Sequence, residues 1–384
     1  MNRNYKVIGI TGTVGKTSTC LMLHKYFLEL NENVISFTTS GIYYNKQIVQ
    51  QEITSTILLD KKKVLEILNK YPAKYIVYEL TAEGGYVHAY DKDIFDVMGL
   101  TNFKLGVVQS FKSDEEYLNG KLNLFNITKS KHKVLNKNST MFFDKVEDKE
   151  SILSYGNFDS DIYTEEFKLR DGLLLSVKLN IFKDFIDTNL IGKLNIENIE
   201  CVASCLKALN ILDEETFRKA LSNIVIPGRL EYLYVNKRHV IIDSGYNGVE
   251  CLWPILKNLD RNRVISVVCT YNFDKEKEIT ELIKTYRSRK GLIFKFYSRL
   301  VIFTKYGRYT GNEEEALDQM TSLIEGYEII ENRIEAIKYA VKHSQENDII
   351  LLIGKGDEIV AVNNNTKEEY RDRDIINTFL GGQL

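Results

Sequence analysis

The chain has 384 residues, more than one hydrophobic core normally serves, so we expect two or three domains. Its composition is 44% hydrophobic, 11% aromatic and 27% charged, which is typical of globular proteins and excludes disordered, collagen-like and coiled-coil chains. The formal net charge of -2 offers no general attraction to nucleic acid or to an anionic membrane, so we predict neither as a partner.

The cysteine content and the N-terminal segment indicate a protein of the reducing cytoplasm. The five cysteines are an odd number without the paired spacing of a disulfide framework. No apolar stretch approaches the roughly 18 residues of a membrane span, and residues 1–5 are polar and lead into a strand rather than a signal peptide. The five histidines show no HxxH or HExxH spacing, so we predict no zinc site.

The first half of the chain alternates short runs rich in β-branched residues with longer amphipathic segments. This pattern is typical of a mostly parallel sheet covered by helices. The predicted strands are residues 5–10, 34–38, 75–80 and 97–100, and the predicted helices are residues 16–30, 61–70 and 114–126. Strand-like segments within residues 162–191 predict an antiparallel appendage to the same domain. Two helices are predicted to follow, at 198–209 and 214–223.

A second domain is predicted after Pro227, because Pro227 and Gly228 interrupt the helical pattern and a new series of strands begins at Tyr232. The domains would therefore be residues 1–227 and 228–384. Short buried-type strands then alternate with helical segments, at residues 240–243, 264–269, 300–304 and 349–354. We expect an α/β protein whose second domain is doubly wound and Rossmann-like.

The segment VIGITGTVGKTST, residues 7–19, places a glycine turn, a lysine and several hydroxyl side chains between a predicted strand and a predicted helix. Backbone N–H groups around Thr13 to Lys16 can bind phosphate oxygens, Lys16 can reach the outer phosphates, and Thr17 can ligate Mg²⁺. The strict Walker pattern has a glycine where this chain has Ile10. The alternative is a plain strand-to-helix turn, but the strand-loop-helix context favours nucleotide binding and a P-loop-type first domain.

The loop TGTVGKTST resembles the TGTxGKTxT loop of the Mur ligases, ATP-dependent enzymes that build the stem peptides of peptidoglycan. Further similar segments follow in the family's order: YELTAE at 78–83, TNF at 101–103, YLNGKLNLF at 117–125, KLNIEN at 193–198, PGRLE at 227–231, IIDSGYN at 241–247, TKYGR at 304–308, NRIEAIKYA at 332–340 and IGKGDE at 353–358. The resemblance covers nearly the whole chain and is greatest to the ligase that adds the third stem-peptide residue. It implies an ATP-dependent carboxylate–amine ligase that forms an acyl phosphate and then an amide or peptide bond.

The resemblance also implies a catalytic set of Lys16, Glu79 and Lys121. Glu79 would bind Mg²⁺ together with Thr17. Lys121 follows Thr101 by 20 positions, a spacing that the family shares, and would be carbamylated as the family's lysine is. A carbamylated lysine is a carboxylate on a long stem, so it would bind or position the metal instead of repelling it. The alternative for a lone helical lysine is a solvated surface charge.

The resemblance assigns binding roles to two further groups of residues. Those expected to bind ATP are Thr13, Gly15, Lys16, Thr17, Ser18, Asn195, Asn198, Arg229 and Asp243. Within this group the two asparagines would contact adenine, with helix capping as the alternative, the arginine would lie near the phosphates, and the aspartate would contact the ribose or the hinge. Those expected to bind substrate are Thr54, Ser55, Thr56, Arg308, Gly354 and Glu358. Here the arginine would pair with a substrate carboxylate and the glutamate with an amino group, or both would be surface charges.

The chain departs from the family's pattern in ways that bear on its substrates. The phosphate loop begins close to the start of the sequence, so we expect no UDP-sugar domain and a small free or carrier-borne carboxylate in place of a UDP-linked one. Gly106 and Val107 replace an aspartate–histidine pair whose histidine helps to hold a second Mg²⁺. Substitutions in the family's other substrate loops are Tyr246, Tyr306, Gly307 and Asp357. The amine is therefore not expected to be diaminopimelate or lysine recognised in the usual way.

Two other interpretations remain open from the sequence. A catalytically weakened nucleotide-binding partner or regulatory subunit of a ligase or amidotransferase complex would account for the missing histidine, although the retained Lys16, Glu79 and Lys121 argue against it. A simple P-loop NTPase or kinase would need no amine-binding C-terminal domain. The sequence identifies neither the carboxylate, nor the amine, nor the oligomeric state.

Overall fold

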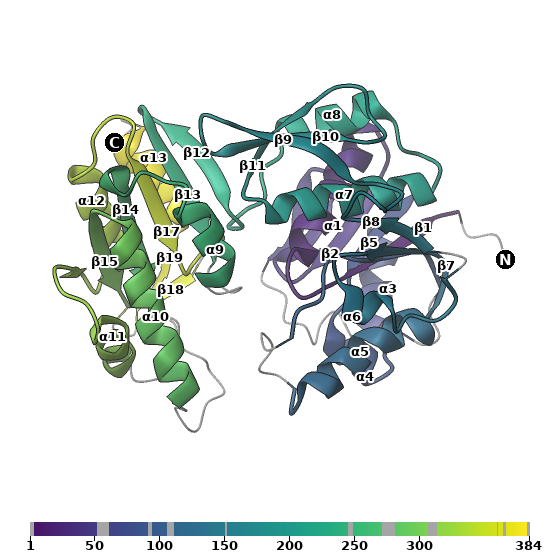
Figure 1. The fold of residues 1–384 in the computed structure, drawn as a ribbon, viewed down its shortest axis with the longest axis horizontal. Coiled ribbons are helices and arrows are strands. Elements are labelled where there is room, and N and C mark those ends of the chain that lie inside the picture. The colour runs from purple at the N-terminus through teal and green to yellow at the C-terminus, as the bar shows by residue number, and fades with distance from the viewer. Residues whose placement is uncertain are drawn as a thin grey trace. The chain divides into compact units, whose positions relative to one another are not determined.

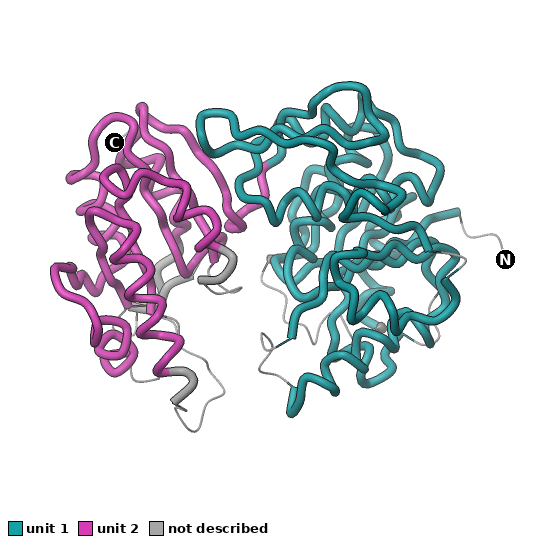
Figure 2. Tube along the Cα trace, viewed as in Figure 1, with its two compact units in different colours: residues 1–224 teal, residues 225–384 magenta. Residues whose placement is uncertain are grey.

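A computed structural model describes residues 4–51, 61–90, 94–105, 111–149, 152–244, 249–270, 281–305, 313–358, 360–363 and 366–381. The chain divides into two compact units, residues 1–224 and 225–384 (Figure 2). This division falls three residues before the boundary predicted at residue 227. Within the described ranges, no helix is both long enough and apolar enough to span a bilayer.

Unit 1 is built on an eight-stranded sheet in the order β4-β3-β2-β5-β1-β6-β7-β8. The strands are β1 (Lys6–Thr11), β2 (Val34–Thr38), β3 (Gly41–Tyr44), β4 (Gln47–Gln51), β5 (Tyr75–Glu79), β6 (Ile94–Leu100), β7 (Lys129–Asn136) and β8 (Ile152–Tyr155). Neighbouring strands from β2 through β5, β1, β6 and β7 to β8 pair in parallel, whereas β3 pairs antiparallel with β2 and with β4. The central strands read as continuous apolar runs because both faces of the sheet are covered.

Helices cover both faces of this sheet (Figure 1). The helices of the unit are α1 (Lys16–Glu29), α3 (Lys61–Lys70), α4 (Ala82–Tyr86), α5 (Asp114–Asn126), α6 (Thr140–Phe143), α7 (Leu194–Ala208) and α8 (Glu214–Ser222). Helices α1, α7 and α8 pack together, and α4 packs against α5. The core on the α5 side includes Phe37, Phe95, Leu124 and Phe125, all almost completely buried.

A three-stranded antiparallel sheet, ordered β11-β10-β9, completes unit 1. Its strands are β9 (Thr164–Arg170), β10 (Leu174–Leu179) and β11 (Ile186–Ile191). They lie within residues 162–191, so the predicted antiparallel appendage is confirmed. The hairpin of β3 and β4 and the outer strands β7 and β8 were not predicted.

Unit 2 is a doubly wound domain with the strand order β12-β13-β17-β14-β15-β16. The strands are β12 (Glu231–Val235), β13 (Arg238–Asp243), β14 (Val264–Cys269), β15 (Leu300–Thr304), β16 (Glu328–Ile329) and β17 (Ile349–Ile353). The β12–β13 pair is antiparallel and the others are parallel. A separate hairpin joins β18 (Val360–Asn363) to β19 (Thr366–Glu369).

The helices of unit 2 are α9 (Val249–Leu256), α10 (Glu281–Tyr297), α11 (Glu313–Thr321), α12 (Arg333–Lys342) and α13 (Asp372–Leu380), with a 3₁₀ turn at Arg261–Arg263. Helix α12 packs against α13, and α10 packs against α9 and α11 (Figure 1). A buried ion pair joins α12 to α13: Nη2 of Arg333 lies 2.7 Å from Oδ2 of Asp372, and both residues are 1% exposed. The predicted α/β class with mostly parallel sheets is confirmed.

Candidate functional site

The glycine-rich loop between β1 and α1 requires glycine at two positions. Gly12 and Gly15 have φ angles of +151° and +85°, which disfavour other residues. A Cβ atom on Gly12 would lie 1.8 Å from Oγ1 of Thr101, and one on Gly15 would lie 2.1 Å from Oδ1 of Asn198. The loop backbone therefore lies directly against Thr101 of the TNF segment and Asn198 of the KLNIEN segment.

Hydrogen bonds from the end of β6 fix the shape of this loop. The N–H of Thr13 donates to the carbonyl of Asn102 at 2.9 Å, and the N–H of Val14 donates to the Asn102 side-chain oxygen at 3.1 Å. Oγ1 of Thr101 donates to the carbonyl of Val14 at 2.6 Å, while the Thr13 hydroxyl shares a 2.8 Å hydrogen bond with that of Tyr117. These contacts fix the shape of the loop, and they use the N–H groups of Thr13 and Val14, which the sequence predicted to bind phosphate oxygens.

Helix α1 starts directly after the loop, at Lys16. The N–H groups of its first turn, which includes Thr17 and the buried Ser18, have no acceptor within the helix. They carry the positive end of the helix dipole and can bind an anion. The ammonium of Lys16 lies over the loop, donating to the carbonyls of Gly12 at 3.1 Å and Thr13 at 3.3 Å. This is an arrangement suited to a polyphosphate.

Glu79 is the last residue of β5, and its side chain is 1% exposed. Its Oε2 accepts hydrogen bonds from Oγ1 of Thr17 at 2.9 Å and from the N–H of Thr39 at 3.0 Å. Its Oε1 accepts from Oγ1 of Thr39 at 3.2 Å. The structure therefore brings together two of the three residues predicted to bind Mg²⁺, Thr17 and Glu79, and adds the neighbouring Thr39.

The donor set fits Mg²⁺. One carboxylate and the hydroxyl of Thr17 are hard oxygen donors, and Mg²⁺ keeps several waters and binds through one or two protein groups plus substrate phosphates. No group of three or more His, Cys, Asp or Glu side chains that could enclose a metal occurs among the described residues. A metal here would therefore depend on phosphate oxygens and on any further oxygen donor close by.

Lys121 lies beside the same loop and is 1% exposed. Its Nζ donates to Oγ1 of Thr11 at 3.1 Å and to the carbonyl of Gly12 at 2.9 Å. Burial, and secondarily the charge of Lys16, lowers the pKa of Lys121 well below its ordinary value, while Glu83 and Glu79 act in the opposite direction. A solvated surface charge does not describe this side chain.

A close contact between two helices places Lys121 there. Helix α5 lies so near α4 that a Cβ atom on Gly85 would come within 1.9 Å of the carbonyl oxygen of Gly120. The ring of Tyr117, one turn before Lys121, has its centroid 5.1 Å from the lysine Nζ. Because Gly85 and Gly120 have no side chains, α5 can approach α4 closely, and this position of α5 brings Lys121 to the phosphate loop.

The two asparagines predicted near adenine are both buried, in the first turns of α7. Nδ2 of Asn198 donates to Oδ1 of Asn195 at 3.0 Å, and Oδ1 of Asn198 accepts from Oγ1 of Thr19 at 3.4 Å. The helix begins at Leu194 with Lys193 in the capping position, so neither asparagine is its N-cap. The capping alternative is wrong, as is the predicted helix start at residue 198.

Three of the residues predicted to bind ligands in unit 2, Arg229, Asp243 and Gly354, lie at the carboxyl edge of its sheet. The N–H of Leu230 donates to Oδ2 of Asp243 at 3.0 Å, and an Nη1 of Arg229 donates to Oγ of Ser244. The N–H of Gly354, whose φ is +118°, donates to the carbonyl of Asp243 at 2.8 Å. These contacts join the PGRLE segment, the end of β13 and the loop after β17.

That loop contains two acidic side chains. Glu358 is 8% exposed. Burial raises the pKa of Asp357, which replaces the histidine of the family pattern, while Arg229 and Arg371 act in the opposite direction. The carboxyl edge is where doubly wound sheets bind ligands, so the loop lies where a ligand of this unit would bind.

Several predicted residues lie outside the described part of the chain. They are Thr54, Ser55, Thr56, Gly106, Val107, Tyr246, Tyr306, Gly307 and Arg308. Their expected roles therefore stay predictions.

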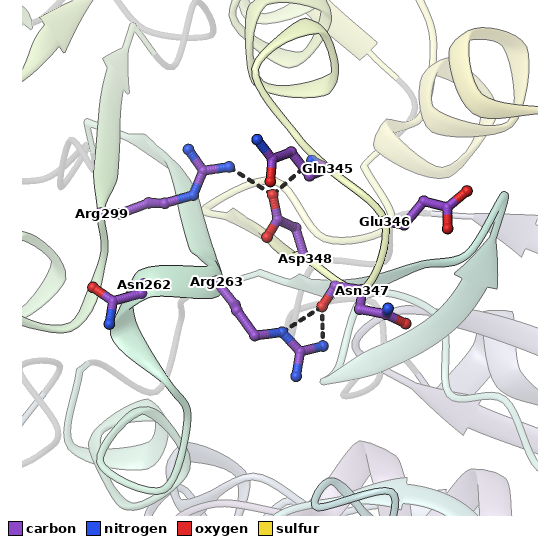
Figure 3. Close-up of a pocket in the computed structure, with 7 residues that line it drawn as sticks. All are labelled: Asn262, Arg263, Arg299, Gln345, Glu346, Asn347 and Asp348. Carbon is purple, nitrogen blue, oxygen red and sulfur yellow. Dashed lines mark hydrogen bonds and ion pairs between the residues drawn. The ribbon is translucent and has the colours of Figure 1, made fainter.

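A polar pocket of unit 2 lies at the opposite, amino edge of its sheet (Figure 3). The two arginines that line it bind the loop that precedes β17. Nε of Arg263 donates to the carbonyl of Asn347 at 2.7 Å, and Nη2 of Arg299 forms an ion pair with Asp348. None of the predicted site residues that the structure describes lines this pocket. It is therefore separate from the candidate site.

Three residues of the site were given no role from the sequence. Thr39 donates to Glu79, and Asn102 and Tyr117 form hydrogen bonds with the glycine-rich loop. Thr39 follows β2 and Asn102 follows β6 closely. Because the carboxyl ends of parallel strands meet at one edge of the sheet, polar residues directly after predicted strands are the signal that could have found the first two.

Comparison with known proteins agrees with this geometry. Residues 10–206 match the Mur ligase middle domain. The chain therefore belongs to the Mur ligase family and, with it, to the ATP-dependent ligases that form carbon–nitrogen bonds.

Its relatives include two UDP-N-acetylmuramoyl-L-alanyl-D-glutamate–2,6-diaminopimelate ligases. The enzyme of Caldanaerobacter subterraneus subsp. tengcongensis is 27% identical over 386 residues, covering 97% of this chain and 78% of the relative. That of Aquifex aeolicus is 28% identical over 392 residues, covering 98% and 77%.

Solved structures show the same fold. A UDP-N-acetylmuramoyl-L-alanyl-D-glutamate–2,6-diaminopimelate ligase superposes with a TM-score of 0.68 at 18% identity, covering 99% of this chain and 79% of that one. The folylpolyglutamate synthase of Thermotoga maritima superposes with a TM-score of 0.67 at 17% identity, covering 91% and 86%.

Proposed function

We propose that this protein joins a carboxylate to an amine through an acyl phosphate formed at the expense of ATP. The observation that carries the proposal is the cluster around the glycine-rich loop: Thr17 and Glu79 at 2.9 Å, with the buried Lys121 donating to the loop itself. A structural P-loop has no need of a buried lysine at this position, because burying an ammonium carries a desolvation cost.

In the first step, an oxygen of the substrate carboxylate attacks the γ-phosphorus of ATP, and ADP leaves. Lys16 and the N–H groups of the first turn of α1 would neutralise the charge that develops on the phosphate oxygens. Thr17 and Glu79 would hold Mg²⁺, which supplies additional positive charge to the phosphates when bound. Asn195 and Asn198 would lie at the adenine.

Lys121 is suited to carbamylation. A neutral amine attacks the carbon of CO₂, forming an N–C bond and releasing one proton, whereas an ammonium has no lone pair to attack with. Because burial lowers the pKa of Lys121 well below its ordinary value, more of the side chain is neutral at a given pH. The resulting carbamate would add an anionic oxygen donor beside Glu79.

In the second step, the amine nitrogen attacks the acyl carbon, phosphate leaves, and the amine loses a proton, which gives the amide. Unit 2 would hold the amine, with Glu358 at its amino group. The presence of Asp357 where the family has histidine favours an amine other than diaminopimelate or lysine bound in the usual way. A carboxylate that is not UDP-linked stays our prediction.

The test uses the purified chain with ATP, Mg²⁺ and bicarbonate, pooled amines, and pooled acids that include a UDP-muramoyl peptide. We expect mass spectrometry to find a product whose mass is that of acid plus amine minus water, with ADP formed in equal amount. The Lys121→Ala variant should make no product, whereas Lys129→Ala, which removes an exposed lysine, should behave as wild type.

Other outcomes separate the alternatives. ADP release without acid or amine would indicate a simple NTPase. Nucleotide binding without any turnover would indicate the regulatory or partner protein. Unchanged turnover in Lys121→Ala would contradict the metal-site assignment.

A further inference from the structure

The reaction described above gives no role to Thr39, although this residue lies at the candidate metal site. Thr39 directly follows β2, and Glu79 is the last residue of β5. The two strands pair in parallel, with Phe37 opposite Tyr78. Their carboxyl ends therefore meet at one edge of the sheet, which is the edge where sheets of this kind bind ligands.

A tight turn fixes the position of Thr39. Thr39 and Ser40 form the two-residue connection between β2 and β3, in which Thr38 pairs with Gly41. Oγ1 of Thr38 donates to the carbonyl of Gly41 at 2.9 Å, and the hydroxyl of Ser40 shares a 3.1 Å hydrogen bond with that of Tyr43. The length of such a connection selects its turn type, so Thr39 is held in a defined place.

Two different groups of Thr39 contact Glu79. The N–H of Thr39 donates to Oε2 at 3.0 Å, an ordinary hydrogen-bond length. Its Oγ1 lies 3.2 Å from Oε1 and 3.3 Å from Oε2. Both distances are longer than the range of about 2.5–3.0 Å that is usual between a hydroxyl and an oxygen acceptor. The N–H thus orients the carboxylate, and the hydroxyl adds little to that task.

The hydroxyl of Thr39 also lies beside that of Thr17. The two Oγ1 atoms are 3.3 Å apart, and Oγ1 of Thr17 is 2.9 Å from Oε2 of Glu79. The three oxygens therefore form a triangle with sides of 2.9, 3.3 and 3.3 Å. Neighbouring oxygens of an octahedral Mg²⁺, each about 2.0–2.1 Å from the metal, are about 2.9 Å apart. Shortening two sides by about 0.4 Å turns the triangle into one face of that octahedron.

A threonine hydroxyl can bind a metal while it remains hydrogen-bonded to the carboxylate. It has one O–H donor and two lone pairs, so a proton directed at Glu79 leaves a lone pair for the metal. Hydroxyl oxygen is also the hard type of donor that suits Mg²⁺. The contacts of Thr39 with Thr17 and Glu79 are therefore those expected of a ligand.

We propose that Thr39 is a third protein ligand of Mg²⁺, so that Thr17, Thr39 and Glu79 present three oxygens to one side of the metal. The remaining positions are left for phosphate oxygens and water. The inference rests on the proposed function for the presence of Mg²⁺ beside the bound nucleotide. It does not depend on which acid and amine are joined, or on whether they are joined.

The test uses the full chain with a non-hydrolysable ATP analogue and with Mn²⁺, which is paramagnetic, in place of Mg²⁺. Electron paramagnetic resonance measures the affinity for Mn²⁺, and electron spin echo spectroscopy in D₂O counts the water molecules bound to it. Thr39→Val keeps the shape and the backbone N–H but lacks the hydroxyl, and Thr39→Ser keeps the hydroxyl. Ser40→Ala removes the neighbouring hydroxyl of the same turn and is the matched control.

We expect Thr39→Val to lose at least about tenfold in affinity for Mn²⁺. Its Mn²⁺ should carry one more water than in the wild type, because water takes the vacated position. Thr39→Ser and Ser40→Ala should match the wild type in both measurements. Thermal unfolding and binding of the analogue in EDTA should be unchanged in all three variants, which shows that each is folded.

The inference is overturned if Thr39→Val keeps the wild-type affinity and water count, if Thr39→Ser loses as much affinity as Thr39→Val, or if the wild type with the analogue binds no Mn²⁺. It is also overturned if the affinity of Thr39→Val falls while the water count stays the same, since Thr39 would then only orient Glu79. Failure of the proposed function looks different: Mn²⁺ would respond to Thr39 as expected, yet no amide product would form. Amide formation together with an unchanged water count in Thr39→Val would leave the ligase standing and remove the inference.

Discussion

Replacing Gly15 by alanine should destabilise unit 1 and weaken nucleotide binding, and a second glycine of the same unit provides a matched control. Gly15 has a φ of +85°, and its new Cβ would lie 2.1 Å from Oδ1 of Asn198. Gly172, in the turn between β9 and β10, has a φ of +72° but no atom within 4 Å of a new Cβ. Gly172→Ala therefore measures the cost of the backbone conformation alone.

The expected magnitudes follow from these contacts. A non-glycine residue in the left-handed region costs roughly 1–2 kcal/mol, which is the whole effect expected for Gly172→Ala. In Gly15→Ala the side chain of Asn198 must also move, and its hydrogen bonds to Asn195 and Thr19 are lost. At about 1 kcal/mol each, these losses bring the total to about 3–4 kcal/mol.

Denaturant unfolding followed by circular dichroism measures the free energy of unfolding, and calorimetry with a non-hydrolysable ATP analogue and Mg²⁺ measures affinity. We expect Gly15→Ala to lose at least about tenfold in affinity, because the loop must shift away from Asn198, and Gly172→Ala to bind as wild type. Equal destabilisation by the two substitutions, or unchanged affinity in Gly15→Ala, would refute the contact between the loop and α7.

Three further predictions concern single side chains. Glu79→Gln keeps the shape of the side chain but removes its charge, so turnover should fall about 100-fold with a higher requirement for Mg²⁺; an unchanged Mg²⁺ titration would count against the metal site. Burial lowers the pKa of His24 from 6.5 to about 4, so the folded state binds fewer protons than the unfolded state between these values. Stability should therefore fall as the pH drops through that range, by up to about 3 kcal/mol, and unfolding of His24→Gln at pH 4 and pH 7 should lack this slope. Arg333→Met leaves Asp372 buried without its partner and should cost about 3–5 kcal/mol of stability, measured by denaturant unfolding. Adding Asp372→Asn should recover much of that loss, and a single variant as stable as wild type would contradict the assignment.

The parts of the site that follow one another in the chain could be predicted from the sequence. The run from Thr13 to Thr17 combines a strand, a glycine turn and a helix start within a few residues, so its local chemistry predicts a phosphate loop. Lys121 differs, because a lysine on a helix carries no local sign of burial. Its prediction depended on the family's spacing, and its burial depends on the approach of α4 to α5 at Gly85 and Gly120.

Other features could not be predicted because their causes are distant in the chain. Asn102 bonds Val14 across 88 positions, and Tyr117 bonds Thr13 across 104; a single amide or hydroxyl gives no hint of such a partner. The first half of β7 is largely exposed, so Lys129–Asn136 lacks the apolar run of a buried strand. The β3–β4 hairpin turns at Asn45, whose φ of +50° is a conformation that asparagine tolerates. Asn45 could therefore have indicated the turn of this hairpin from the sequence.

The hydrogen bonds from Thr101 and Asn102 have a consequence for how the protein meets its nucleotide. Since folding itself fixes the Thr13–Val14 backbone, the entropy of arranging the loop is lost once, when the chain folds, and is not lost again at each catalytic cycle. The N–H groups that follow it, at the start of α1, are therefore arranged before a polyphosphate binds, and the rigidity of the loop contributes to affinity.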